Sequence, residues 1–182
     1  MDDVQIIDDF LPPAEALEIR QAFVNHFVNP HLHTLEHQIW NYWHVSGIYT
    51  YLRTNPAKLQ MRHDRVVNAI WDKFGRKVTH PYLSLYIAGC RQGWHNDAAN
   101  GQRGWVYSIT PNDRLSTGGE TLVWRGHHKL NTPNAGSGLH HVIEPKFNRL
   151  IVFDDQLPHA VSMVEGSMCP LEGRVVLHGH IL

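Results

Sequence analysis

Residues Gly173-Arg174-Val175-Val176-Leu177-His178 form a short run rich in β-branched side chains behind a glycine. Runs of this kind, bounded by Gly, Pro and Asn, are typical of the strands of an antiparallel sandwich or barrel. They recur through the second part of the chain, over residues 82–88, 104–110, 120–125, 139–144, 149–154 and 173–181. The pattern favours a mainly β, jelly-roll-like barrel of about eight strands over alternating βαβ units.

The first 77 residues have a different pattern. A short strand is predicted over residues 4–10, and Pro12-Pro13 then opens a helix with one apolar face that ends near Phe27. A second helix is predicted from Asp64 to Phe74, and residues 28–60 between the two are predicted to be irregular. We therefore expect one domain over residues 1–182, with helical support and a variable segment in 1–77 and the barrel core in 78–182.

The composition excludes several classes of protein. Lys and Arg total 16 against 17 for Asp and Glu, a formal charge of −1, whereas binders of nucleic acid or anionic membranes depend on a basic surface. With 42% hydrophobic and 18% charged residues, the chain is expected to fold rather than stay disordered. The 15 histidines are many for a chain of 182 residues and raise the question of a metal.

Three features predict a soluble, cytoplasmic protein. The start, Met1-Asp2-Asp3-Val4, is acidic and no apolar core follows it, so it does not look like a secretory signal. No run approaches the ~18 apolar residues of a membrane span. Cys90 and Cys169 are too few for a disulfide framework, and we expect free thiols in a reducing compartment.

The segment Trp94-His95-Asn96-Asp97 holds the first two candidate metal ligands. Side chains at i and i+2 of a strand point the same way, so His95 and Asp97 can share one ligand. His159 comes shortly after the apolar run 150–153 and would complete a set of two histidines and one carboxylate. Such a set occupies one face of an octahedral metal and leaves the other open, as in non-haem Fe(II) oxygenases. His-x-Asp alone is common, and a core or turn histidine is the alternative interpretation of His95.

Two further side chains could hold an anion beside this metal. Arg174 lies within an apolar strand, where a buried guanidinium needs either a ligand anion or an internal Asp or Glu. Tyr86 precedes His95 by nine residues and is expected on the neighbouring strand. A buried tyrosine hydroxyl needs a partner, although Tyr86 could also be an ordinary strand aromatic.

The order Tyr86-x-x-Gly89, His95-x-Asp97, Gly118-Gly119-Glu120-Thr121, Phe153, His159 and Arg174 resembles the Fe(II)/2-oxoglutarate-dependent dioxygenases, and most of all their prolyl-4-hydroxylase-type branch. The likeness covers nearly the whole chain, least of all residues 28–60. It implies a double-stranded β-helix, the cupin-like jelly roll, with supporting N-terminal helices. It also implies that His95, Asp97 and His159 hold Fe(II), while Arg174, assisted by Tyr86, binds the 5-carboxylate of the cosubstrate 2-oxoglutarate.

The resemblance further implies the reaction. O2 and 2-oxoglutarate would be consumed, with ascorbate as a candidate reductant, and a C–H bond of an amino-acid, peptidyl or small-metabolite substrate would be hydroxylated with release of succinate and CO2. Asp97 argues against halogenation, because halogenating relatives lack this carboxylate. Nucleic-acid repair demethylases carry a second Arg six residues after the first, where this chain has His180, so no nucleic-acid partner is expected.

The chain departs from the resembling families at the predicted anion clamp. The prolyl branch usually has Lys where Arg174 stands, and relatives with Arg often carry Ser or Thr two residues later, where this chain has Val176. His178 and His180 share the parity of Arg174 and are expected to point inward with it, as satisfied core histidines. Four aromatic residues could either fill the core or line the pocket: Trp40, Tyr42, Trp43 and Trp94.

Two other functions are kept as alternatives. One is a non-catalytic barrel that uses the metal site for binding or sensing. The other is a zinc hydrolase, because His33-Thr34-Leu35-Glu36-His37 spells the inverted zincin signature His-x-x-Glu-His. Asn29-Pro30 directly precedes this motif, and no third ligand follows at a matching distance. Oligomeric state, regiochemistry and the physiological substrate stay open at this point.

Overall fold

The structure is a computed structural model that describes residues 3–29, 39–45, 49–124 and 139–182. The α-helices are α1 (Pro13–Val28) and α2 (His63–Phe74), and short 3-10 turns span Pro56–Leu59 and Pro170–Glu172. The strands are β1 (Val4–Ile7), β2 (Asn41–Val45), β3 (Tyr49–Thr54), β4 (Tyr82–Tyr86), β5 (Arg91–His95), β6 (Arg103–Ser108), β7 (Thr121–Trp124), β8 (Leu139–Ile143), β9 (Arg149–Asp154), β10 (His159–Val161) and β11 (Arg174–Ile181).

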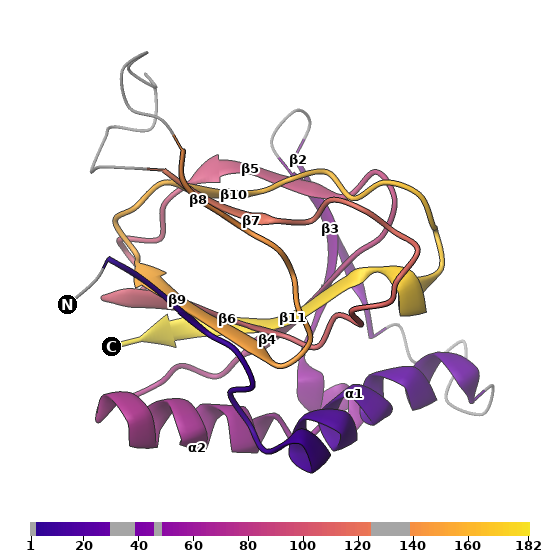
Figure 1. The fold of residues 1–182 in the computed structure, drawn as a ribbon, viewed down its shortest axis with the longest axis horizontal. Coiled ribbons are helices and arrows are strands. Elements are labelled where there is room, and N and C mark those ends of the chain that lie inside the picture. The colour runs from indigo at the N-terminus through magenta and orange to yellow at the C-terminus, as the bar shows by residue number, and fades with distance from the viewer. Residues whose placement is uncertain (1–2, 30–38, 46–48, 125–138) are drawn as a thin grey trace.

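Within the described residues the strands form one antiparallel sheet that curls into a barrel-like shell (Figure 1). Its order is β1-β9-β6-β11-β4-β3-β5-β10-β7-β8, and β2 pairs with the remaining edge of β3. Strands far apart in the sequence are therefore neighbours, which is the topology of a jelly roll or double-stranded β-helix. The predicted mainly β fold class is confirmed, and both helices lie together along one side of the shell (Figure 1).

Alternation along β11 separates the helix-packed core from the barrel interior. Val175 and Leu177 are fully buried in the core that the sheet forms with α1 and α2, where they join Ile19 and Phe23. Arg174 and His178, of the opposite parity, line the interior of the barrel instead. Because successive strand side chains point to opposite faces, the apolar residues that dock the helices also turn the polar residues inward. Each fully buried aliphatic or aromatic side chain of this core contributes roughly 1.5–3 kcal/mol.

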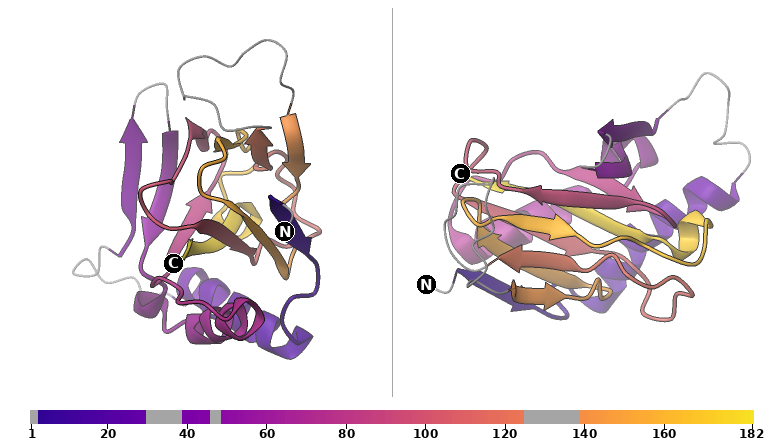
Figure 2. Two further views of the ribbon diagram at one scale, coloured as in Figure 1. Left: turned by 90° about the vertical axis from the view of Figure 1, so that its left-hand side faces the viewer. Right: turned by 90° about the horizontal axis from the view of Figure 1, so that it is seen from above.

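The prediction that residues 28–60 are irregular is wrong over much of its described part. Strands β2 and β3 form a hairpin there (Figure 2), and β3 joins the sheet by pairing with β4 over Leu52–Thr54 and with β5 over Tyr49–Thr50. The side chains of β2 are exposed, so this strand lacks the apolar alternation by which a half-buried strand is predicted.

The apolar runs predicted as strands include neither β5 nor β10, although the interpretation of His95 and Asp97 assumed a strand. β5 reads Arg-Gln-Gly-Trp-His and β10 only His-Ala-Val, so neither has a recognisable apolar run. Their hydrogen bonds to neighbouring strands, and not local propensity, make them strands.

Cys90 is buried, Cys169 is exposed, and both are free thiols, as expected. No described helix combines the length and the apolar character needed to cross a membrane.

Candidate active site

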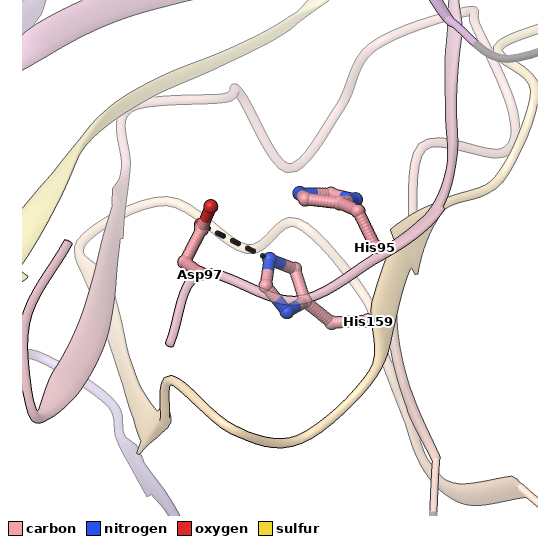
Figure 3. A group of neighbouring side chains, drawn as sticks. All are labelled: His95, Asp97 and His159. Atoms are coloured by element: carbon pink, nitrogen blue, oxygen red, sulfur yellow. Dashed lines mark ion pairs between the residues drawn. The ribbon is translucent and has the colours of Figure 1, made fainter. Parts of the chain in front are cut away.

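The three predicted metal ligands come together at the end of two paired strands. His95 and His159 lie directly opposite each other on β5 and β10, and their ring centroids are 4.2 Å apart. Asp97 follows two residues after His95, and its Oδ2 is 3.5 Å from Nε2 of His159. One ligand atom from each residue lies within 4.8 Å of the other two (Figure 3). The three ligand atoms are thus close enough together to bind one ion of the first transition series.

The backbone fixes the orientation of both imidazoles. Nδ1 of His95 is 2.8 Å from the carbonyl oxygen of Gly93, and Nδ1 of His159 is 3.0 Å from that of Leu157. A carbonyl only accepts, so each Nδ1 carries the hydrogen and each Nε2 keeps its lone pair. This arrangement is the usual support of a metal-binding histidine.

The local electrostatics keep these groups in the protonation states that a metal requires. Burial, aided by the nearby His159, lowers the pKa of His95 to about 4, so that its ring is neutral at physiological pH. Burial alone would raise the pKa of Asp97, but the facing His159, with His95 and His180 nearby, holds it well below its usual range. A neutral imidazole and an ionised carboxylate are the forms that bind a metal ion.

The Asp97 carboxylate is held by the loop after β5. The Asp97 amide donates to the carbonyl of Asp155 over 2.9 Å, and the side-chain amide of Asn100 donates to Oδ1 of Asp97 over 3.1 Å. Oδ2 is left to face His159. Asp97 therefore acquires its position from this loop and not from the strand on which the prediction placed it, since β5 ends at His95.

Arg174 and Tyr86 form the candidate anion clamp. They are direct partners across β11 and β4, and Cζ of Arg174 lies 4.7 Å from the ring centroid of Tyr86. The guanidinium is buried, and burial lowers its pKa although the phenol beside it opposes this effect. Its Nη2 donates to Oγ1 of Thr121 over 3.2 Å, while its Nε has no partner within the described part of the chain.

No carboxylate of the described residues lies within 4 Å of this guanidinium. Among these residues, then, no internal Asp or Glu forms the salt bridge that was the alternative partner for the buried Arg174. A buried arginine with an unpaired N–H group is suited to bind an anionic ligand. The hydroxyl that Val176 cannot supply comes instead from Thr121 on β7, a residue that the sequence analysis quoted but did not assign. The feature of the sequence that could have identified Thr121 is its position at the end of the Gly-Gly-Glu-Thr motif.

Tyr86 does not lie on the strand next to β5, as had been expected, because β3 is inserted between β4 and β5. It is connected to the metal ligands through Gln92, which the sequence analysis missed. The Tyr86 hydroxyl donates to Oε1 of Gln92 over 3.0 Å, and Nε2 of Gln92 is 3.1 Å from Nε2 of His95. Tyr51 of β3 stacks on Tyr86 at a centroid distance of 5.0 Å and closes this side of the site.

These groups surround a cavity of about 600 Å³. His178 and His180 line it, so the expectation that they point inward is confirmed. Nε2 of His178 lies 2.8 Å from Oγ of Ser84, and Nδ1 of His180 lies 3.1 Å from the buried carboxylate of Asp155. Burial, with the positive charges of Arg53 and Arg174, lowers the pKa of His178 to about 3.

Four aromatic residues had been left open between the core and the pocket. Trp40 packs against Phe23 and Phe27 of α1 and is core filler, whereas Tyr42, Trp43 and Trp94 are at least partly exposed to solvent and Trp43 contacts the cavity-lining Arg53. The His-x-x-Glu-His motif with His33, Glu36 and His37 lies outside the described residues, so the structure says nothing of it.

Comparison with known proteins agrees with the fold and the motif order. A family model of the 2OG-Fe(II) oxygenase superfamily matches residues 82–181. No curated protein sequence matches significantly. Among solved structures, a prolyl hydroxylase from Trichoplax adhaerens, in complex with a hypoxia-inducible-factor peptide fragment, is similar with a TM-score of 0.67 at 15% identity, over 100% of this chain and 84% of that one.

Two further structures share the fold at similar distance. A Pseudomonas putida prolyl-4-hydroxylase has a TM-score of 0.63 at 16% identity, over 98% of this chain and 91% of that chain. The non-haem α-ketoglutarate-dependent epimerase SnoN from nogalamycin biosynthesis has a TM-score of 0.64 at 16% identity, over 98% of this chain and 76% of that one. Relatives of the same architecture thus include both hydroxylases and an epimerase.

The double-stranded β-helix with two histidines and a carboxylate at its interior defines a non-haem iron oxygenase. The family match extends over more than half of the chain, and the protein belongs to the 2OG-Fe(II) oxygenase superfamily. It is therefore a 2-oxoglutarate-dependent oxygenase, and its family uses Fe(II), 2-oxoglutarate and O2.

Proposed function

We propose that this single-domain oxygenase hydroxylates a C–H bond of an amino-acid, peptidyl or small-metabolite substrate, with release of succinate and CO2. His95, Asp97 and His159 are the proposed Fe(II) ligands, and Arg174, assisted by Tyr86, is the proposed binding group for the 5-carboxylate of 2-oxoglutarate. The observation that carries the proposal is the convergence of three ligand atoms within 4.8 Å in a cavity that also contains an unpaired buried arginine.

The donor set fits the Fe(II) that the family uses. Three protein ligands on one side of the ion leave coordination positions open for a chelating keto acid and for O2. The Nδ1–H groups of His95 and His159 already donate to backbone carbonyls, so both Nε2 atoms can bind the ion without a change of tautomer. The two imidazoles and Asp97 would hold the ion at the inner wall of the barrel.

Arg174 supports 2-oxoglutarate as the second ligand. A guanidinium binds a carboxylate through two parallel N–H···O bonds, and the buried environment strengthens them. Thr121 Oγ1, 3.2 Å from Nη2 of Arg174, can donate its own hydroxyl hydrogen to the same carboxylate. The Tyr86 ring beside the guanidinium limits the orientations that Arg174 can adopt.

When bound, the iron, the keto acid and O2 supply the oxidation: one oxygen atom enters succinate, the other enters the substrate as a hydroxyl, and CO2 leaves. The chain itself binds and orients the reactants and keeps water away from them. Phe153 contributes to this exclusion, because its ring packs 4.6 Å from that of His159.

The substrate class is proposed by likeness to the neighbours. Two similar structures are prolyl hydroxylases, and one of them holds a peptide, which supports an amino-acid or peptidyl substrate. The epimerase of the same fold shows that the architecture also hosts other outcomes of C–H activation. Hydroxylation is therefore tested by its product.

The test is succinate formation from 2-oxoglutarate by the Fe(II)-loaded protein, followed by a mass-spectrometric screen for products 16 Da heavier across amino acids and peptides. We expect succinate in the wild type and none in Asp97→Ala. A barrel that only binds or senses metal would form no succinate with any substrate. Succinate formation retained in Asp97→Ala would contradict the proposal. A zinc hydrolase would form no succinate, and its hydrolytic activity would be lost in His33→Ala and kept in Asp97→Ala.

A further inference from the structure

A second arginine, Arg53, lines the cavity and has no role in the proposed chemistry. It lies on β3, where its cross-strand partners are Asn41 of β2 and Ser84 of β4. It has the same parity as Tyr51, which also lines the cavity, so both face the barrel interior. Arg174 is fully buried, whereas Arg53 is half-buried and so stands closer to solvent.

Two aromatic rings hold the guanidinium of Arg53 in place. Its Cζ lies 3.7 Å from the ring centroid of Trp43 on β2 and 4.1 Å from that of Tyr82 on β4. The guanidinium carbon lies over both rings, as in cation–π contacts, and such contacts leave the N–H groups of an arginine able to bind an anion. An arginine fixed in this way loses little side-chain entropy when it binds an anion, because its rotamer is already restricted.

No carboxylate in the described part of the chain lies within 4 Å of Arg53. Its positive charge is felt by side chains of the cavity instead. It contributes to the lowered pKa of His178, and it opposes the rise that burial causes in the pKa of Tyr51. A surface arginine would face water or an acidic neighbour. Arg53 faces a cavity whose described charged residues are another arginine and Asp97.

The charges of the loaded site indicate what Arg53 would bind. With His180 and the buried Asp155 counted together as a neutral pair and the other imidazoles counted as neutral, Fe(II), Arg53 and Arg174 outweigh Asp97 by three positive charges. The dianion 2-oxoglutarate leaves one positive charge uncompensated. A monoanionic substrate would neutralise it, whereas a phosphate dianion would overcompensate and an internal peptide residue with an uncharged side chain would supply no charge.

We propose that Arg53 is the substrate-anchoring residue and binds a free α-carboxylate, so that the substrate is an amino acid, either free or at the C-terminus of a peptide. This assignment rests on the proposed function, which it narrows. It places the substrate's carboxylate against the N–H groups of Arg53, on the side of the cavity formed by β3 and β4, while Arg174 binds the cosubstrate.

The test is calorimetric titration of the protein loaded with Zn(II), which cannot turn over, and saturated with 2-oxoglutarate. The probes are the twenty common L-amino acids and their N-acetyl derivatives, each compared with its carboxamide. We expect at least one acid to bind, and its carboxamide to bind about 10- to 100-fold more weakly, since the lost contact is a charged hydrogen bond. Equal binding of the free and N-acetylated acid indicates a peptide C-terminus, and dependence on the free amine indicates a free amino acid.

Variants locate the effect. Arg53→Met should weaken the bound acid by at least about tenfold, and Arg53→Lys, which keeps the charge but not the planar donor edge, should weaken it less. Arg62→Met is the matched control, because Arg62 is exposed and pairs with Asp64 outside the cavity. The comparison of each acid with its carboxamide uses only the wild type. It therefore still tests the assignment if Arg53→Met does not fold.

The assignment is overturned if no acid binds, if a carboxamide binds as tightly as its acid, or if a folded Arg53→Met binds the acid like the wild type. Succinate formation by the Fe(II)-loaded wild type is measured in parallel. Its absence beside intact, Arg53-dependent carboxylate binding would overturn the proposed function but not the role of Arg53. Its presence without carboxylate binding would overturn the role of Arg53 alone.

Discussion

Gly119 lies directly against Arg174. A Cβ atom at position 119 would be 2.9 Å from Cδ and 3.2 Å from Cβ of Arg174, and Gly119 has a φ of +76° that L side chains rarely adopt. The Gly-Gly turn before β7 therefore does more than reverse the chain. Its second glycine leaves the space in which the buried arginine extends towards Thr121.

Replacing Gly119 by alanine should impair cosubstrate binding. The added methyl group would displace the Arg174 side chain, so we expect Gly119→Ala to raise the KM for 2-oxoglutarate. Substrate-independent succinate formation as a function of 2-oxoglutarate concentration measures this effect.

Gly89→Ala is the matched control, because Gly89 has a φ of +86° but no atom within 4 Å of an added Cβ. Both variants should lose roughly 1–2 kcal/mol of stability from the left-handed backbone. Only Gly119→Ala should change the KM, and an equal change in both would mean that strain, not contact with Arg174, is responsible.

Removal of the guanidinium itself should have a larger effect. Arg174→Ala is expected to raise the 2-oxoglutarate requirement by about 2–4 kcal/mol of binding free energy, the value of a hydrogen-bonded charge pair. Thr121→Val removes one neutral hydroxyl and should cost about 0.5–1.5 kcal/mol. Titration of 2-oxoglutarate into the metal-loaded variants measures both, and unchanged affinity in Arg174→Ala would place the clamp elsewhere.

Substitution of a proposed metal ligand should cause the loss of both bound metal and turnover. His95→Ala and Asp97→Ala each remove one of three ligand atoms, so we expect bound iron to fall and succinate formation to stop. Metal analysis of the purified variants and the succinate assay check this. His33→Ala should retain iron and activity, and a variant of Asp97 that kept full iron content would exclude it as a ligand.

Asp8 should stabilise the fold in a pH-dependent manner. Its hydrogen bond with Arg149 outweighs desolvation and, together with Lys146, lowers the pKa of Asp8 from 3.8 to about 2. A depressed pKa stabilises the folded state fully above the unfolded value, and this contribution disappears as the pH falls towards 2.

We therefore expect Asp8→Asn to be less stable than the wild type at pH 6, by less than about 1 kcal/mol because Asp8 is partly exposed. The difference should shrink between pH 4 and pH 2. Urea unfolding followed at several pH values measures it, and a constant difference would show that packing, not charge, is what the substitution changes.

Residue order alone predicted the jelly roll, the two helices and the candidate ligand set of His95, Asp97 and His159, which the structure brings together, because hydrophobic periodicity and the order of polar groups can be read along the chain. The inward orientation of His178 and His180 followed from the same alternation.

Tertiary structure alone decided which strands are neighbours. The insertion of β3 between β4 and β5, the contact of Thr121 with Arg174, and the aromatic contacts of Arg53 join residues that are far apart along the chain. Strand order in an antiparallel sheet is set by the packing of whole elements, and the short polar strands β5 and β10 owe their conformation to those neighbours. The periodicity of a segment indicates which of its sides is buried but not which strand it pairs with. The contact of Thr121 with Arg174 and the place of Arg53 in the cavity could therefore be found only in the folded protein.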